Sequence, residues 1–600
     1  MNSPHEIVES IAEIGVTSEG RNAIALTETE DRTIEHVRQM AERLFGQYHI
    51  EPSQYEIRSD AFGNLFITFF GEDKNHAVMS GSHVDSVKNG GKYDGVAGVA
   101  SAIRFLEHLL HEGRRPHLSY TVAVFRAEES SPTTGVACLG SKIATGTITR
   151  SALDHIRYKK SDGQETTLRE HFCQRYGADK WVQVLKELDE PPINRDNTVH
   201  FEEVHIEQSR LGEMKEADVG IVSQGIGGSR REKVQVSADQ LKKEALIVPE
   251  SIPYVRMNIT THGRAEHSGG TPPNTIWHEK GILGGRDDGR MITRSDALVA
   301  LSHMIADIEQ YRLQPLDSQQ LPLDLRGQVA EFNQRAEQSG FPRWARIASI
   351  TSPVETGYTT IPAEQTLEVL LPRQHEEVFR QLVQQHSGVM RREGVGYEIA
   401  TESIHPGTYT VIPLSNAIAA MGIAGAVAHE VEMHVLGRWV VDPKHVSDVG
   451  EVRATVTDFN FDPTNGLRFK IDERNVDSEQ GKKIAGAIGS LVERNLMSMG
   501  IDSQESRTVV SDTSPSPIDR QSVETKLSIA QTLGFKPVVM PSVPGQDAGS
   551  ISKAGIPTSM TYICHPGISH SPDESVDPPY LEKAVAVSHA YLMRLLNSAA

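Results

Sequence analysis

Over the first 125 residues of the chain, short apolar runs typical of strands alternate with segments whose apolar residues recur at helical spacing. Residues 31–46 show the spacing of an amphipathic helix, with apolar side chains at Ile34, Val37, Met40, Ala41 and Leu44. A second helix is predicted over residues 97–110, and strands are predicted over residues 55–58, 65–70, 77–79 and 121–125. Strands that alternate with helices indicate an α/β sheet, whose sites lie beyond the carboxyl ends of its strands.

The pattern changes along the rest of the chain. Residues 147–200 are charged and helix-prone, which is typical of peripheral cover. From Gly225 onward, strands are predicted over residues 255–260, 467–471 and 507–510, and helices over residues 296–311 and 481–499. This β-α-β pattern indicates a separate smaller domain inserted into the first. An α/β pattern returns over residues 513–600 and ends in a helix over residues 581–596.

The region from about residue 313 to residue 447 gives no clear pattern of elements, apart from one weak internal echo. Thr360–Arg373 resembles Phe461–Arg474 in its proline, its alternating apolar strand and its terminal arginine. A partly duplicated lid explains this echo, and so does a chance resemblance of two strands.

Composition narrows the class of protein. The 600 residues exceed one ordinary domain, and the formal net charge of −20 argues against nucleic-acid or anionic-membrane surfaces, which need an excess of Lys and Arg. Three cysteines without CxxC spacing exclude a disulfide framework and a thiolate zinc site. With no signal-peptide pattern and no apolar run near the ~20 residues that span a bilayer, we expect a cytoplasmic protein.

Candidate chemistry starts in a glycine-rich segment that follows the apolar run at residues 76–79. It contains His83, Asp85 and Asp94. Alternate residues of a strand share a face, so Asp85 can hold one nitrogen of His83 while the other nitrogen binds a metal. A single His-x-Asp pattern is more often structural, so the reading depends on later segments.

Three later segments supply further candidate ligands. Glu128 and Glu129 follow a predicted strand, so one carboxylate can bind metal while the other faces substrate. His205 and Glu207 share a strand face, and His570 lies in a turn of small residues. Each alone is more often structural or solvated. Together, nitrogen and oxygen ligands suited to two divalent ions, with Asp94 able to bridge, come from His83, Asp94, Glu129, His205 and His570.

These motifs resemble the M20 metallopeptidase superfamily. The similarity is to its amidase branch of hydantoinase/carbamoylase type: N-carbamoyl-L-amino-acid hydrolases, β-ureidopropionases and allantoate amidohydrolases. The matching segments fall within residues 20–300 and 450–600 and are Asp60–Leu65, Gly81–Asp85, Gly90–Gly95, Glu128-Glu129, Gly135–Ser141, His205–Gln208, His267–Pro272 and Gly567–Pro572.

The resemblance implies an α/β fold in which an M20-type catalytic domain has a mixed sheet flanked by helices. It also implies an inserted ferredoxin-like (α+β) domain that serves as lid and dimerisation domain, here enlarged. The catalytic domain would comprise residues 1–228 and 513–600, and the lid residues 229–512, with an atypical insertion at about 313–447. A small-molecule substrate and a homodimer formed through the lid are expected, with no nucleic-acid or membrane partner.

The resemblance also implies two divalent metal ions per subunit, drawn from Zn²⁺, Mn²⁺, Co²⁺ or Ni²⁺. His83, Asp94 and His205 would hold one ion. Asp94, Glu129 and His570 would hold the other.

Further roles follow from the resemblance. Asp85 would orient His83, and Glu128 would be the general base that activates water and then protonates the leaving nitrogen. His267, in this family usually from the partner subunit, would stabilise the tetrahedral intermediate. The expected substrate-binding residues are Gln208, Asn460, Arg474 and Gln546, among which the arginine suits a carboxylate.

Three departures from the family pattern concern the substrate. The usual Arg-Phe pair after the glutamates is replaced by Ser130–Thr134, and Gln546 stands where the family has a histidine. Insertions occupy about 274–290 and 313–447. Because the ligands and the base are present, we expect activity to be retained and specificity to be changed.

The sequence therefore predicts a hydrolase that cleaves the linear C–N amide bond of an N-carbamoyl amino acid or a related ureido acid. An M20-type aminoacylase or peptidase is the main alternative. A metal-bound scaffold without catalytic activity is a third reading.

Overall fold

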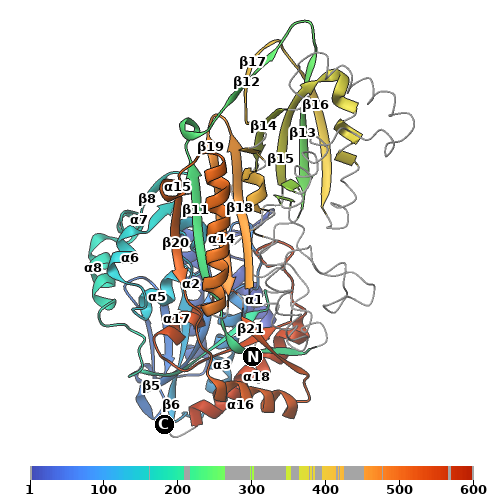
Figure 1. The fold of residues 1–600 in the computed structure, drawn as a ribbon. Coiled ribbons are helices and arrows are strands. Elements are labelled where there is room, and N and C mark those ends of the chain that lie inside the picture. The colour runs from blue at the N-terminus through green and yellow to red at the C-terminus, as the bar shows by residue number, and fades with distance from the viewer. Residues whose placement is uncertain are drawn as a thin grey trace.

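The computed structural model shows two large sheets, each with its own helices, one above the other in Figure 1. Both chain termini lie in the lower part, which contains the first sheet. The structure describes residues 3–160, 163–208, 217–263, 346–352, 364–377, 395–413, 452–475, 478–542, 544–564 and 569–597, with a few helical positions at 297–302, 379–384 and 416–427.

The first sheet has eight strands in the order β21-β10-β22-β9-β5-β6-β4-β3. It is mixed: β5 pairs in parallel with β6 and β9, whereas β4 pairs antiparallel with β6 and β3. The strands are β3 (Tyr55–Ser59), β4 (Leu65–Phe69), β5 (Asp73–His83), β6 (Leu118–Phe125), β9 (Thr198–Ile206), β10 (Val219–Ile226), β21 (Pro537–Ser542) and β22 (Thr558–Ile563).

The central strand β6 shows why this sheet has helices on both faces. All eight of its residues are buried, and successive side chains enter different cores. Val122 and Val124 belong to one core, whereas Ala123 and Phe125 belong to the core on the opposite face. A strand that is buried at every position needs cover on both sides, because its side chains alternate between the faces.

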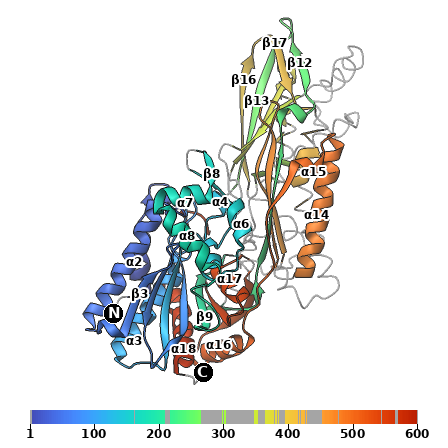
Figure 2. The same cartoon turned by 90° about the vertical axis from the view of Figure 1, so that its left-hand side faces the viewer.

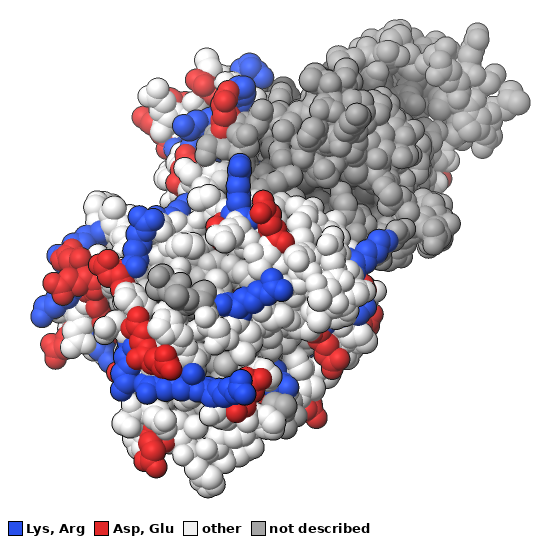
Figure 3. All heavy atoms as spheres, turned by 90° about the horizontal axis from the view of Figure 1, so that it is seen from below, with Lys and Arg blue, Asp and Glu red and all other residues white. Residues whose placement is uncertain are grey.

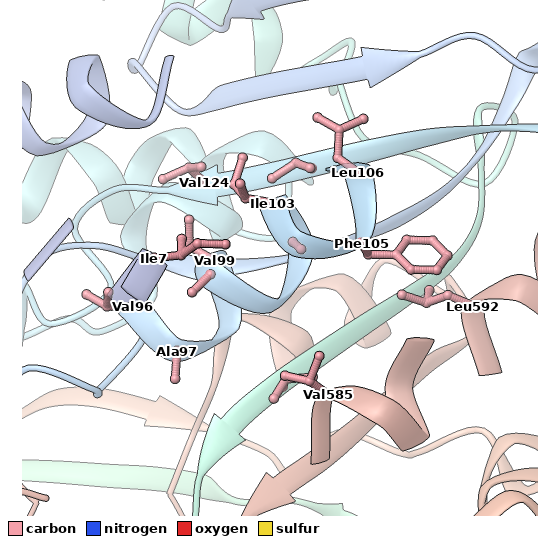
Figure 4. Close-up of a cluster of buried hydrophobic side chains, with 14 of the residues drawn as sticks. Ile7, Val96, Ala97, Val99, Ile103, Phe105, Leu106, Val124, Val585 and Leu592 are labelled. Atoms are coloured by element: carbon pink, nitrogen blue, oxygen red, sulfur yellow. The ribbon is translucent and has the colours of Figure 1, made fainter. Parts of the chain in front are cut away.

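One face is covered mainly by α1, α3 and α18, and α17 lies on the other face against β9 and β22. Figure 4 shows Ile7 of α1, Phe105 of α3 and Leu592 of α18 gathered in the first core. The helices of this part are α1 (Pro4–Ala12), α2 (Glu28–Gln47), α3 (Val96–Glu112), α4 (Ser131–Thr134), α5 (Leu139–Ala144), α6 (Arg150–His155), α7 (Leu168–Tyr176), α8 (Ala178–Glu187), α16 (Arg520–Thr532), α17 (Asp547–Lys553) and α18 (Pro578–Asn597).

The parallel strands end at a common edge of the first sheet. His83 at the end of β5 lies opposite Phe125 at the end of β6, and Ile206 at the end of β9 lies opposite Ile563 of β22. The segments that leave these four strands therefore meet beyond one edge, where α/β sheets place their sites.

The second sheet also has eight strands, in the order β16-β13-β15-β14-β18-β19-β11-β20, and every neighbouring pair is antiparallel. The helix α14 (Ser478–Ser498) packs on β19, and Figure 2 shows this helix beside the sheet seen nearly edge-on. The strands are β11 (Gly228–Val236), β13 (Tyr254–His262), β14 (Arg346–Thr351), β15 (Glu364–Pro372), β16 (Gly396–Ile404), β18 (Val452–Asp462), β19 (Gly466–Asn475) and β20 (Arg507–Thr513).

Smaller elements complete the described chain. The strands β12 and β17, distant in the sequence, form a two-stranded antiparallel sheet at the top of Figure 1. These elements are α15 (Ser503–Ser506) and the strands β1 (Val16–Thr17), β2 (Gly20–Arg21), β7 (Arg157–Lys159), β8 (Glu165–Thr167), β12 (Glu244–Val248) and β17 (Gly407–Val411).

The predicted α/β class is confirmed, and the predicted strands and helices of the first 125 residues are present with small shifts at their ends. β5 begins four residues earlier than expected, because Asp73 already pairs with Leu118 of β6, and the register shifts between Asp73 and Ala77. Of the helix expected over residues 296–311, only 297–298 and 301–302 are described, and they are helical. The division at residues 228/229 and 512/513 stays a prediction. Within the described residues, no helix is both long and apolar enough to cross a membrane.

Candidate metal centre and substrate cleft

The loop between β5 and α3 brings Asp94 back over His83. Gly95 makes this possible: its φ is +69°, and a Cβ there would lie 2.4 Å from the His83 ring. Glu574 holds the loop from the other side, because its Oε1 accepts the N–H groups of Tyr93 (2.7 Å) and Asp94 (3.0 Å). The C-terminal part of the chain therefore fixes a residue of the N-terminal motif.

A sharp backbone turn after β6 positions the two glutamates. Ala127 has a left-handed φ of 56°, and its N–H donates to Glu30 Oε1 at 2.6 Å. Both oxygens of the Asp85 carboxylate then accept the next N–H groups, from Glu128 (3.1 Å) and Glu129 (2.9 Å). Asp85 thus ties the end of β5 to both glutamates.

Asp94 lies between two groups of possible metal ligands. Its Oδ1 is 3.6 Å from His83 Nε2 and 3.2 Å from His205 Nε2. Its Oδ2 is 3.4 Å from His570 Nε2, which lies 2.7 Å from Glu129 Oε1. In each three-residue group the ligand atoms lie within 4.8 Å of one another, and all five residues are buried.

The hydrogen bonds of two histidines leave the correct nitrogen facing Asp94. With a proton on Nδ1, His83 donates to the Asp85 carbonyl at 3.2 Å, and His205 donates to the Ile206 carbonyl at 3.0 Å. Nε2 is then a bare acceptor in each ring. Within the described chain, His205 Nε2 and Asp94 Oδ1 are buried without a hydrogen-bond partner. Two acceptors that face each other in this way fit a cation between them.

The charge of the centre fits cations as well. Carboxyl groups outnumber imidazoles in this buried space, and isolated buried carboxylates are costly. Burial opposes ionisation of Asp94, but contacts with His205, His570 and His83 hold its pKa well below the usual range. The buried carboxyl groups are Asp85, Asp94, Glu128, Glu129, Glu203, Asp547 and Glu574.

Glu128 belongs to neither ligand group but lies beside both. Its Oε2 is 3.9 Å from His83 Nε2, and its Oε1 accepts a hydrogen bond from the Cys138 thiol at 2.9 Å. Burial raises the pKa of Glu128 to about 7. A carboxyl group near the ligands but not among them has the position that a general base needs.

Two predicted substrate residues are linked to the centre by consecutive hydrogen bonds. Gln208 donates from Nε2 to Asp94 Oδ2 at 2.8 Å, and Gln546 donates from Nε2 to Gln208 Oε1 at 2.9 Å. Gln546 also precedes α17 as its N-cap residue. The two amides therefore form a chain from the shared aspartate to the adjoining cleft.

That cleft is strongly cationic. It is lined by Lys142, Arg231, Arg474 and Lys553, together with Cys138 and Gln546. One acidic residue binds both arginines: Asp472 lies 3.3 Å from Arg231 Nε and 3.0 Å from Arg474 Nε. Burial lowers the pKa of Lys142, and the positive charges of Arg231 and Lys553 lower it further. A cleft in which cations repel one another favours an anionic ligand.

The cleft differs from the face drawn in Figure 3, where acidic and basic side chains are interspersed over the described surface. Sequence reasoning identified Arg474 but missed Arg231, Lys142 and Lys553. It also missed the thiol of Cys138, although that residue stands inside the matched segment Gly135–Ser141. A cation next to a motif is too common in the sequence to indicate such a site.

Of two further predicted residues, one lies away from the cleft and the other lies outside the described residues. Asn460 is opposite Arg468 in the β18–β19 pair, whereas Arg474 is opposite Arg453, about 20 Å further along at the strand rise per residue. The Asn460 Oδ1 accepts the N–H of Ser352 at 3.1 Å. The structure therefore does not bring Asn460 and Arg474 together. His267 lies outside the described residues.

Curated relatives match parts of the chain. It is 32% identical over 196 residues to ureidoglycolate hydrolase of Arabidopsis thaliana, covering 32% of this chain and 39% of that protein. It is 31% identical over 233 residues to N-carbamoyl-L-amino-acid amidohydrolase of Pseudomonas sp. (strain NS671), covering 38% and 51%. Allantoate amidohydrolase of Bacillus subtilis is 30% identical over 185 residues, covering 31% and 42%. The matches thus span about half or less of these relatives.

Solved structures show the same fold over nearly the whole chain. A hydantoinase/carbamoylase family amidase from Burkholderia multivorans superposes with a TM-score of 0.51 at 17% identity, covering 100% of this chain and 98% of that one. AtUAH in complex with (S)-hydroxyglycine gives a TM-score of 0.53 at 15% identity, covering 99% and 97%. The predicted resemblance to M20-type amidases is confirmed. Since the profile of peptidase family M20/M25/M40 matches residues 79–594, most of its length, the chain belongs to that family.

Proposed function

We propose that this protein is a dinuclear metal-dependent amidohydrolase. Its reaction is cleavage of the linear C–N amide bond of an N-carbamoyl amino acid or a related ureido acid. The observation that carries the proposal is the pair of buried ligand groups that share Asp94, with Glu128 beside them. The relatives named above for N-carbamoyl amino acids, allantoate and ureidoglycolate support the substrate class.

The residues that would hold the metals are those of the two groups: His83, Asp94 and His205 for one ion, and Asp94, Glu129 and His570 for the other. Two divalent ions, when bound, supply an acidified water and a polarised carbonyl oxygen. The bare Nε2 of His205 facing Asp94 Oδ1 supports this assignment. Zn²⁺, Mn²⁺, Co²⁺ and Ni²⁺ all suit such a set of nitrogen and oxygen ligands.

Glu128 would take the proton from the attacking water and deliver it to the leaving nitrogen. The Cys138 thiol bonded to its Oε1 leaves Oε2, the oxygen nearer the ligands, available for this transfer. Asp85 acts as a positioning residue, because it holds His83 Nδ1 and the two N–H groups that orient the glutamates. His267 is proposed to stabilise charge on the tetrahedral intermediate, on the basis of the resemblance alone.

The cationic cleft supports the proposal that the substrate carries a carboxylate. Arg474 is proposed to bind the substrate carboxylate, with Arg231 on the other side of Asp472. A guanidinium can grip a carboxylate through two hydrogen bonds. Gln208 and Gln546 would face the ureido end, because their amides run from the cleft to Asp94. Asn460 is kept as a proposed substrate residue on the resemblance alone.

The test is ammonia release by the full chain, purified free of metal and reloaded with each of the four ions. The substrates are N-carbamoyl-L-amino acids, allantoate and ureidoglycolate, compared with N-acetyl amino acids and dipeptides. Ammonia from the ureido acids, dependent on metal, is the expected result. Amino-acid release from N-acetyl or dipeptide substrates without ammonia from any ureido acid would favour an aminoacylase or peptidase. Metal binding without any turnover would favour the scaffold.

A further inference from the structure

The strand order of the second sheet contains the same pattern twice. The strands β13, β14, β15 and β16 stand in the order fourth, first, third, second, counted along the chain. The strands β11, β18, β19 and β20 stand in the same order when counted from the opposite edge, β20. The two sets therefore meet at their second strands, β14 and β18, as the two halves of a symmetric pair would.

Helices occur at equivalent places in both sets. Between the third and fourth strands, one set has α14, and the other has described helical positions at 376–377, 379–381 and 383–384. Between the first and second strands, one has described helical positions at 416–417, 419–424 and 427, and the other has them at 297–298 and 301–302. Each set is thus a β-α-β-β-α-β unit. The unit with β13–β16 is inserted after the first strand, β11, of the outer unit.

The sequence supports a repeat at the same place. The echo between Thr360–Arg373 and Phe461–Arg474 falls on β15 and β19, the third strands of the two units. Their prolines, Pro362 and Pro463, precede equivalent strands. The echo had two explanations, a duplicated lid and a chance resemblance of two strands. Duplication also explains the repeated strand order, whereas a chance resemblance of two strands does not.

The units are joined through buried contacts. Ile350 of β14 pairs opposite Phe461 of β18, and both side chains are buried. Gln365 Nε2 of the inserted unit donates to the Phe459 carbonyl of the outer unit at 3.1 Å. One apolar core runs through both units and includes Val255 and Phe469. Each unit therefore covers the sheet edge of the other, which is how two subunits would close their edges.

The remaining outer edges carry charged side chains. The exposed edge strand β16 contains Glu398 and Glu402, and β20 contains Arg507 and Asp512. Charged edge strands disfavour pairing with another sheet. A second copy would thus find the apolar edges already paired within the chain.

We propose that the inserted unit takes the place of a second subunit, so that the protein functions as a monomer with both halves of the lid interface in one chain. The expected homodimer is thereby replaced. One sequence observation agrees with a self-contained chain, and it rests on the role of His267 in the proposed function. The His267 segment follows β13, the first strand of the inserted unit, whereas Ser237–Lys243, which follows β11, the first strand of the outer unit, contains no histidine. The inserted unit would thus supply the histidine that in this family usually comes from the partner subunit.

The direct test is sedimentation equilibrium of the full chain over a hundredfold range of concentration. The expected mass is that of one chain, 66.0 kDa, at every concentration. A mass of twice that value, or one that rises toward it with concentration, would overturn the proposal. This readout does not depend on activity, so it stands even if the proposed substrate is wrong.

Four variants sharpen the test, two through unfolding and two through activity. Phe461→Glu at the junction should lower the unfolding temperature equally at all protein concentrations, whereas Ile247→Glu at an exposed position of β12 should not change it. A concentration-dependent unfolding temperature would indicate subunit dissociation instead.

Mixing Glu128→Gln with His267→Ala should give no more activity than the two proteins separately. Recovery of activity on mixing would contradict a self-contained chain.

Discussion

The candidate metal centre and the cationic cleft beside it are built in different ways. Each ligand of the metal centre follows or ends a strand of the first sheet, or lies in the C-terminal turn at His570. The cleft takes its cations from four separate elements. Two are helices that accompany the first sheet, with Lys142 on α5 and Lys553 on α17, and two are strands of the second sheet, with Arg231 on β11 and Arg474 on β19.

This difference separates chemistry from specificity. The ends of neighbouring strands fix the ligands to one another, so the centre depends on the first sheet. The cleft depends on how the second sheet lies against the first, as the hydrogen bond from Arg231 Nη1 to the Gly135 carbonyl (3.2 Å) shows. Changes in the cleft should therefore alter substrate affinity and leave the metal centre intact.

The largest expected effect is on turnover in Glu128→Gln. Loss of a general base typically lowers kcat by about 10²–10⁴-fold, and the ligands are untouched, so metal content should not change. Steady-state kinetics with metal analysis would measure both. Glu42→Gln, on the exposed face of α2, is the matched control. Full activity in Glu128→Gln would remove this residue as the base.

The next effect is on KM in Arg474→Gln. Loss of a charge-assisted hydrogen bond of about 1.5–3 kcal/mol should raise KM for a ureido acid roughly 10- to 100-fold at unchanged metal content. An analogue whose carboxylate is an amide should lose much less, and Arg474→Lys should recover part of the affinity. Equal losses for the acid and its amide would show that Arg474 acts only in the fold.

Gly95→Ala should weaken metal binding, whereas Gly113→Ala should not. Both glycines have positive φ, but a Cβ at residue 95 meets the His83 ring and a Cβ at residue 113 meets nothing within 4 Å. The strained backbone alone costs about 1–3 kcal/mol in each. Metal titration and thermal unfolding, with and without metal, would separate the two effects. Equal metal affinity in both variants would contradict the close passage of the loop over His83.

The smallest expected effect is in Lys553→Gln. An exposed charge at the rim of the cleft contributes roughly 0.4–1 kcal/mol, so KM for a ureido acid should rise about two- to fivefold, and less at high salt. Lys483→Gln, exposed on α14, is the control. If the two variants behave alike, the rim of the cleft does not attract the substrate.

The grouping of the candidate metal ligands could be predicted from the sequence, because these residues stand in short motifs with strand-end spacing. His83, Asp85 and Asp94 lie within one stretch of twelve residues. The tertiary contacts that complete the site could not be predicted. Glu574 reaches Tyr93 across a separation of 481 residues, and Ser141 reaches Asp547 across 406. Which side chains meet over such separations depends on how distant segments of the chain pack together, which local periodicity does not encode.

The second sheet gives the same lesson at the level of the fold. The strands that contain Val255 and Leu467 were predictable, because apolar and polar residues alternate in them. The pairing of β14 with β18 was not, because a single register pair, Ile350 with Phe461, joins two segments of no mutual sequence signal. Only the faint echo between β15 and β19 pointed to two units.

The central claim is a centre of two ions that share Asp94, and metal stoichiometry tests it most directly. The full chain is stripped with a chelator, reloaded with Mn²⁺ and analysed for tightly bound metal per chain. The account predicts two ions in the natural chain, one or none in Asp94→Asn, and loss of ureido-acid hydrolysis in parallel. A single ion in the natural chain, or two ions retained in Asp94→Asn, would contradict it.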